Sequence, residues 1–309
     1  MISSTTTSAF FDRSTQDIAS LRAQANTLQS QISSGQRLDT ASQDPVAAAR
    51  LRELTRAQTL SAIDTTASNR ANADLTLADT TLQSFADAVT QAQGLATQAA
   101  SAVLNTSQRA SIGVQLAQIH SQLVSLANTR DATGNALFGG QVAGGASGQA
   151  YTLDAAGNAS YSGTPAATQV SLGEGQSVTT SLTGPEFLNF TLAGAPTDLL
   201  TTIKTLADAL QSGTGNPQAA AQSSLTALNT GLDTIANAQT VVGSRLAFVD
   251  LTNQHRQTVG DLRTTEQGDL GGTDIASTIV QLQQTLLVLQ ASQDSFARLS
   301  SLNLFDKIN

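Results

Sequence analysis

The residues that could perform chemistry are few and lie far apart in the chain. Cysteine is absent, which excludes disulfides, thiolate metal sites and cysteine nucleophiles. The two histidines, His120 and His255, fall in separate segments, and neither belongs to a His-Glu-x-x-His pattern. Because zinc sites and acid–base sites need several suitable side chains together, the sequence predicts no metal, no cofactor and no enzymatic activity.

Other polar features are typical of structural roles. The glycine-rich segment GGQVAGGASGQ, residues 139–149, contains no Gly-x-x-x-x-Gly-Lys, so we do not expect a phosphate-binding loop. Asp17, Asp39 and Asp44 are scattered, as solvated or helix-capping carboxylates are. For Arg245 two interpretations remain: an ion pair that ties its helix to a neighbouring carboxylate, or a side chain that lies along the surface with its charge in water.

The composition favours closely packed helices. The 309 residues include no Trp and only two Tyr, so a core must be built from Leu, Ile, Val and Ala. The net charge is −8, and residues 131–203 contain no Lys or Arg, which argues against nucleic acid as a partner. No stretch is long and apolar enough for membrane insertion. The N-terminal MISSTTTSAFFDR lacks the features of a cleaved signal peptide, which leaves a cytoplasmic protein or export without signal cleavage.

Both ends of the chain carry apolar residues at alternating spacings of three and four, the heptad pattern of packed helices. The N-terminal positions are Ile18, Leu21, Ala25, Leu28 and Ile32. The C-terminal positions are Ile275, Ile279, Leu282, Leu286, Leu289 and Phe296. Each terminal helix is set apart by a break. Gly35 suits a helix end, Asp44 and Pro45 suit an N-cap and first turn, and Gly271-Gly272 marks the second break.

Between the breaks, long helical segments flank a region rich in glycine. Helical sequence runs over residues 45–104, and Asn105 offers a cap for a further heptad run over residues 112–126. Asn216-Pro217 starts another heptad helix, which continues to about residue 250. The segments AYTLDAAGNASYSG and TQVSLGEGQSVTTSLTG each predict strand, turn and strand. We expect these long helices to pack within one chain.

We therefore predict a mainly α fold, an elongated bundle of long coiled-coil-like helices from both halves of the chain with a small central β-rich insert. Residues 41–134 and 197–269 form the helical core, and residues 135–196 form the β-rich region with hairpins. Residues 1–40 and 270–309 form terminal assembly helices, disordered in the monomer. Paired with each other alone, these two helices leave apolar surface in water, so we expect them to find partners in other subunits.

Several segments together resemble the bacterial flagellin superfamily, and within it the hook–filament junction proteins. ISSGQRLDTASQDPVAAARL resembles the N-terminal signature, with Asp-Pro where filament flagellins usually carry Asp-Asp-Ala. NALFGG, VVGSRLAFVD and QASQDSFARLSSLNLFDKIN resemble further segments of the junction proteins, and the resemblance covers nearly the whole chain.

The resemblance implies a structural role and a set of partners. These are a homo-oligomeric ring, hook-associated protein 1, flagellin and a cytoplasmic export chaperone. It also implies secretion to the extracellular flagellum through the type III export apparatus. Subunit assembly is assigned to the terminal heptads: Ile18, Leu21, Leu28, Ile32, Ile279, Leu282, Leu286, Leu289 and Phe296. Gly35, Asp44, Pro45 and Arg245 are structural motif residues. A filament-forming flagellin and a coiled-coil export substrate or regulator remain the alternatives.

Overall fold

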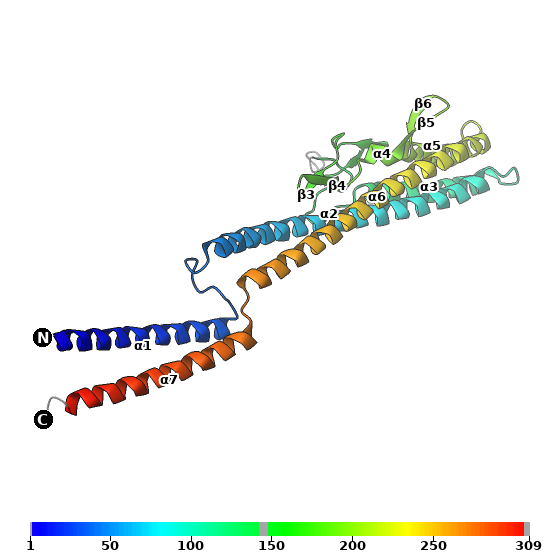
Figure 1. Ribbon diagram of the computed structural model, residues 1–309. Helices are drawn as coiled ribbons and strands as arrows, with labels where there is room; N and C mark the ends of the chain where they lie inside the picture. Colours follow the sequence, from blue (N-terminus) through cyan, green and yellow to red (C-terminus); the bar gives the residue numbers. More distant parts are fainter. Residues whose placement is uncertain (1, 142–147, 306–309) are drawn as a thin grey trace. The chain divides into compact units, whose positions relative to one another are not determined.

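The computed structural model describes residues 2–141 and 148–305, with side-chain environments from residue 9 to residue 300 within these ranges. Long helices dominate, and the strands form two-stranded antiparallel sheets. The predicted fold class, mainly α with a small central β-rich region, is confirmed (Figure 1). The elements in chain order are α1 (Ile2–Ser34), α2 (Pro45–Ala99), α3 (Thr106–Ala127), β1 (Tyr151–Leu153), β2 (Ala159–Tyr161), β3 (Gln169–Gly173), β4 (Gln176–Thr179), α4 (Gly184–Leu188), β5 (Asn189–Leu192), β6 (Ala195–Asp198), α5 (Leu199–Ser212), α6 (Pro217–Gly271) and α7 (Ile275–Phe305).

The chain divides into two compact units. One unit consists of residues 1–60 and 258–309, and the other of residues 61–257. The sequence places the boundary at the helix breaks near residues 40 and 270. By their contacts, the first turns of α2 and the last turns of α6 group with the terminal helices. We call these parts the terminal unit and the central unit.

The core of the central unit follows the heptad pattern. On α2 the buried positions alternate by three and four over several turns, so one apolar stripe faces the other helices. These positions are Ala71, Leu75, Ala78, Leu82, Phe85, Val89, Ala92, Ala96 and Ala99. On α6 the fully buried side chains Leu228, Ile235, Val242 and Val249 recur every seven residues. These stripes are buried within one chain, as the sequence predicts.

Helix ends in the central unit are set by side-chain caps. Asn105 and Gln108 form a reciprocal capping box at the start of α3, and Asn216 Oδ1 accepts from Ala219 N at the start of α6. α2 ends earlier than expected, at Ala99 and not near residue 104. The guanidinium of Arg109 donates to the carbonyls of Ala99 and Ser101, so it satisfies acceptors that would otherwise continue the helix.

In the described part of the β-rich region, the strands form three hairpins. β1 pairs with β2 and β3 with β4, as the sequence predicts. The third hairpin, β5 with β6, was not predicted. The sequence assigns residues 197–269 to the helical core, but residues 197 and 198 belong to β6, and α5 starts at Leu199 with Asp198 as its N-cap. The residues of β5 and β6 are too few to show a clear alternation in the sequence.

His120 is buried in the central unit without a hydrogen-bond partner for Nε2 among the described residues. Its side chain on α3 is 4% exposed. Burial lowers the pKa of His120, and the nearby Lys204 lowers it further, while Asp198 and Asp208 act in the opposite direction. Because the pKa of His120 is lower in the folded chain than in the unfolded chain, protonation of the imidazole favours the unfolded chain. Stability is therefore retained above about pH 6.5 and lost as the pH falls toward the folded pKa.

We expect the thermal midpoint of the unsubstituted chain to be lower at pH 5 than at pH 7, and this difference to be smaller in His120→Gln. Glutamine carries no charge at either pH, so it removes this contribution to the pH dependence. Circular dichroism melting curves at both pH values measure the difference. His255→Gln is the matched control, because it removes the exposed histidine of α6 and keeps the buried imidazole of His120. Equal pH dependence of His120→Gln and the unsubstituted chain would contradict the assignment to His120.

Candidate assembly surface

The terminal unit brings the two ends of the chain together as an antiparallel helix pair. α1 and α7 lie side by side (Figure 1), with the rings of Phe11 and Phe296 in edge contact, their centroids 5.4 Å apart. At the other end of the pair, Gln36 forms a backbone bridge with Gly272. α1 and α7 therefore pack against each other within the same chain.

Part of each predicted assembly seam is used inside this pair. On α1, Ala25 and Leu28 are buried, and Ile18, Leu21 and Ile32 are half-buried. On α7, the buried Thr278 and Thr285 lie in the same stripe as the half-buried Leu282, Leu289 and Phe296. Phe296 contacts Phe11, so we infer that this stripe faces α1. Six of the seam residues of the two helices are therefore only partly covered.

A second stripe of α7 stays exposed, although it is apolar. Ile279 and Leu286, both predicted as assembly residues, are 40% and 47% exposed. The other large apolar side chains exposed on the terminal pair are Phe10, Ile275, Val280, Leu287, Val288 and Leu299. A set of large apolar side chains exposed on one side of a helix is typical of a surface that binds another protein. We refer to the exposed stripe of α7 that contains Ile275, Ile279, Val280, Leu286 and Leu287 as the free face.

The two helix breaks of the sequence meet in the terminal unit. Gly35 has a positive φ of 68°, which ends α1 at Ser34 as predicted. The amide of Arg37 donates to the carbonyl of Gly271 at 2.8 Å, and the amide of Thr273 donates to the carbonyl of Gly35 at 3.0 Å. The segment after α1 and the segment before α7 therefore form one hydrogen-bonded junction.

Arg37 is the residue of this junction that the sequence analysis missed. Its guanidinium donates to the carbonyl of Leu270 near the end of α6, at 3.0 Å from Nη2 and 3.2 Å from Nε, and pairs with Asp44 at 3.2 Å. A basic side chain at a helix C-terminus satisfies carbonyls that have no partner within the helix. The local signal is an arginine two residues after the helix-ending glycine.

Asp44 and Pro45 have the roles expected from their types. Asp44 Oδ1 accepts from the amide of Ala47 at 3.0 Å, and Pro45 is the first residue of α2. The hydrogen bond from Ala47 lowers the pKa of Asp44, and the bond from Arg37 lowers it further. Farther along α2, Arg50 pairs with Glu266 of α6 at 2.6 Å and with Glu53 at 3.0 Å. The pair of Arg50 with Glu266 connects the start of α2 with the end of α6.

Arg245 lies in the central unit, and neither expectation for it describes what is found. Its guanidinium donates to the carbonyl of Ser181 at 2.8 Å, so its partner is the backbone before α4 and not a carboxylate. The hydrogen bond ties α6 to the β-rich region.

Within the described ranges, no group of three or more His, Cys, Asp or Glu side chains is arranged to hold a metal. In the same ranges, no helix combines the length and apolar character needed to cross a membrane.

Comparisons with known proteins agree with the resemblance seen in the sequence. Residues 7–143 match the family described as the bacterial flagellin N-terminal helical region. Flagellar hook-associated protein 3 of Salmonella typhimurium is 29% identical over 134 residues, and that of Escherichia coli is 32% identical over 110 residues. These matches cover 43% and 36% of this chain, and 42% and 35% of the relatives. The matched region is thus less than half the length of either curated relative.

A solved structure from Vibrio parahaemolyticus, described as a flagellar hook-associated protein, has the same fold. It superposes with a TM-score of 0.67 at 21% sequence identity and covers 74% of this chain and 100% of its own. The resemblance to the flagellin superfamily, and within it to flagellar hook-associated protein 3, is confirmed.

Proposed function

We propose that this chain, which resembles the flagellins and among them flagellar hook-associated protein 3, is a structural subunit of the bacterial flagellum. Copies of the chain form an adaptor ring that joins the hook to the flagellin filament outside the cell. The observation that carries the proposal is the free face of α7, an apolar helix face on a unit built from both ends of the chain. Such a face suits a subunit that packs against further copies and against related proteins at either side.

The terminal helices, residues 1–40 and 270–309, are the assembly region in this proposal. The covered stripe of the pair includes Leu28, Leu282, Leu289 and Phe296, and the free face adds Ile279 and Leu286. Because the pair buries so little of its apolar surface, we propose that assembly and not the free chain gives these helices most of their stability. The proposed role is structural and assigns no reaction to the chain.

The proposed partners follow from the junction role. Hook-associated protein 1 lies on the hook side of the ring and flagellin on the filament side. A cytoplasmic chaperone holds the chain before type III export. The alternative, a filament-forming flagellin, is supported by the flagellin family match and uses the same terminal helices.

Deletion of the gene tests the junction role directly. We expect electron microscopy to show hooks without filaments, and flagellin to appear unassembled in the medium. Expression of the intact chain from a plasmid should restore filaments. Normal filaments in the deletion strain would refute the proposal. Elongation of filaments by the purified chain alone would instead establish the flagellin alternative.

A further inference from the structure

Asp74 occupies a position on α2 where the fold calls for an apolar side chain. It lies in the same stripe as the fully buried Ala71, Leu75 and Ala78, and only 9% of its own surface is exposed. Among the described residues, no hydrogen bond and no ion pair reaches its carboxylate. Burial of an ionised carboxylate without a partner is costly, and a buried ionisable side chain that lines a cavity is a candidate binding residue.

The neighbouring polar groups are already used. Arg70, one turn earlier on α2, donates from Nη2 to Thr133 Oγ1 at 3.2 Å. Asp131 Oδ1 accepts from the amide of Thr133 at 2.8 Å and from the amide of Asn135 at 2.9 Å. Arg70 therefore influences Asp74 through the electrostatic effect of its charge and not through a hydrogen bond.

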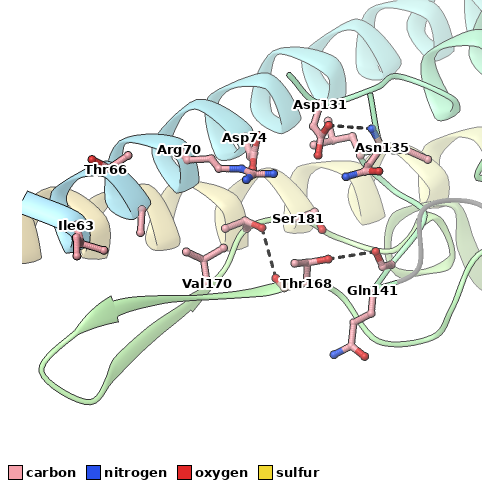
Figure 2. A pocket seen from close by; sticks show the side chains of 15 residues that line it. Ile63, Thr66, Arg70, Asp74, Asp131, Asn135, Gln141, Thr168, Val170 and Ser181 are labelled. Carbon is pink, nitrogen blue, oxygen red and sulfur yellow. Dashed lines mark hydrogen bonds between the residues drawn. The ribbon is translucent and has the colours of Figure 1, made fainter. Parts of the chain in front are cut away.

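Asp74 lines a cavity of about 790 Å³ inside the central unit. Figure 2 shows Arg70 and Asp74 on the α2 side, Asp131 and Asn135 at one end, and Thr168 and Ser181 on the opposite side. Ile63, Ala67, Leu137 and Val170 add apolar wall. This volume lies within the range of protein ligand sites, roughly 300–1,000 Å³.

The walls opposite α2 cannot supply a counter-charge. They come from residues 131–141 and 168–181, and residues 131–203 contain no Lys or Arg. The basic residue that lines the cavity is Arg70 on the α2 side, and its guanidinium is bonded to Thr133 Oγ1 and not to Asp74.

We propose that this cavity binds the guanidinium group of an arginine presented by another protein chain. Asp74 would accept from the guanidinium, whose planar set of five N–H donors leaves further donors for Asp131 Oδ2, since the bonds from Thr133 and Asn135 go to Oδ1. The apolar walls suit the methylene stem of the same side chain. Any chain that presents such an arginine meets these requirements, so the inference does not rest on the junction role.

The electrostatics of the empty cavity agree with this assignment. Burial raises the pKa of Asp74, and Asp131 raises it further, while Arg70 lowers it. A raised folded pKa means that the ionised carboxylate destabilises the free chain. This cost is fully present above the folded pKa and absent below the unfolded pKa. An incoming guanidinium would remove that cost.

Two peptides of equal shape test the proposal. Acetyl-Ala-Arg-Ala-amide carries the guanidinium, and acetyl-Ala-citrulline-Ala-amide replaces it with a neutral urea. We expect isothermal titration of the full chain at low salt to give at least tenfold tighter binding for the arginine peptide. Asp74→Asn should abolish that difference. Asp79→Asn, which removes a charge of α2 outside the cavity, should preserve it. Equal binding of both peptides, or preference that survives Asp74→Asn, would overturn the proposal.

Stability provides an independent measurement. Asp74→Asn should raise the thermal midpoint of the free chain at pH 7, and the gain should disappear below about pH 3.8, where the carboxyl is protonated even in the unfolded chain. A lower midpoint at pH 7 would mean that the carboxylate holds the fold together internally, and the cavity would then need no external cation.

Discussion

Replacing Ile279 and Leu286 together by aspartate will leave the isolated chain folded and prevent its assembly on the hook. Both side chains are on the free face of α7, 40% and 47% exposed, and neither belongs to the stripe that faces α1. Aspartate in their place meets water in the monomer and costs little. In the proposed ring, each carboxylate would be buried against a neighbouring subunit without a counter-charge.

The expected loss is large because each buried carboxylate costs several kcal/mol and the ring repeats both in every subunit. About 1.4 kcal/mol corresponds to a tenfold change in affinity, so we expect at least a ~100-fold loss of binding. Purified variant added to isolated hooks that carry hook-associated protein 1 measures the effect without the export step. Thermal unfolding of the monomer should match that of the unsubstituted chain.

Ser277→Asp with Gln284→Asp is the matched control for this variant. Ser277 and Gln284 are exposed and, like Ile279 and Leu286, are seven residues apart on α7. Aspartate at both positions adds the same charge, but to a polar face of the helix. This control should assemble. If Ile279→Asp with Leu286→Asp assembles equally well, the free face is not a subunit contact.

The sequence pattern separates helices from breaks well because both depend on local chemistry. Gly35, Asp44 and Pro45 have the predicted roles, since left-handed backbone and N-capping are properties of single residues. The heptad pattern of residues 112–126 likewise falls on a buried helix face of the central unit. It does not say which partner covers a stripe, so Leu286 and Leu289, equivalent in the sequence, differ in the structure: one is exposed and the other lies in the stripe facing α1.

Contacts between residues that are distant in the sequence cannot be predicted from these local patterns. Arg37 donates to Leu270, and Thr273 donates to Gly35, across more than two hundred residues. The sequence indicates both helix breaks, but it does not indicate that the two breaks are hydrogen-bonded to each other. Asp74 was missed for a similar reason. It looks like one more polar residue of α2 until residues 131–141 and 168–181 enclose it. Its place in the buried stripe is the signal that could have singled it out.

Replacing Phe138 by alanine will destabilise the central unit more than any substitution on its surface. Phe138 belongs to the segment NALFGG, and its fully buried ring forms a cluster with those of Phe85 on α2 and Phe187 on α4. The centroid of Phe138 is 4.9 Å from that of Phe187 and 6.5 Å from that of Phe85. Three segments remote in sequence therefore meet at these rings, and the rigid core around them has no means of filling the space that an alanine leaves.

We expect Phe138→Ala to lower the free energy of unfolding by about 3–5 kcal/mol, the usual cost of removing a buried phenylalanine ring. For a unit of this size the thermal midpoint should fall by on the order of 10 °C, measured by circular dichroism. Phe248→Ala is the control, because Phe248 on α6 is 38% exposed, and its midpoint should fall by far less. Comparable effects of the two substitutions would show that the three-ring cluster does not hold α2, α4 and the NALFGG segment together. The β-rich region would then depend on other contacts, such as the hydrogen bond from Arg245 to Ser181.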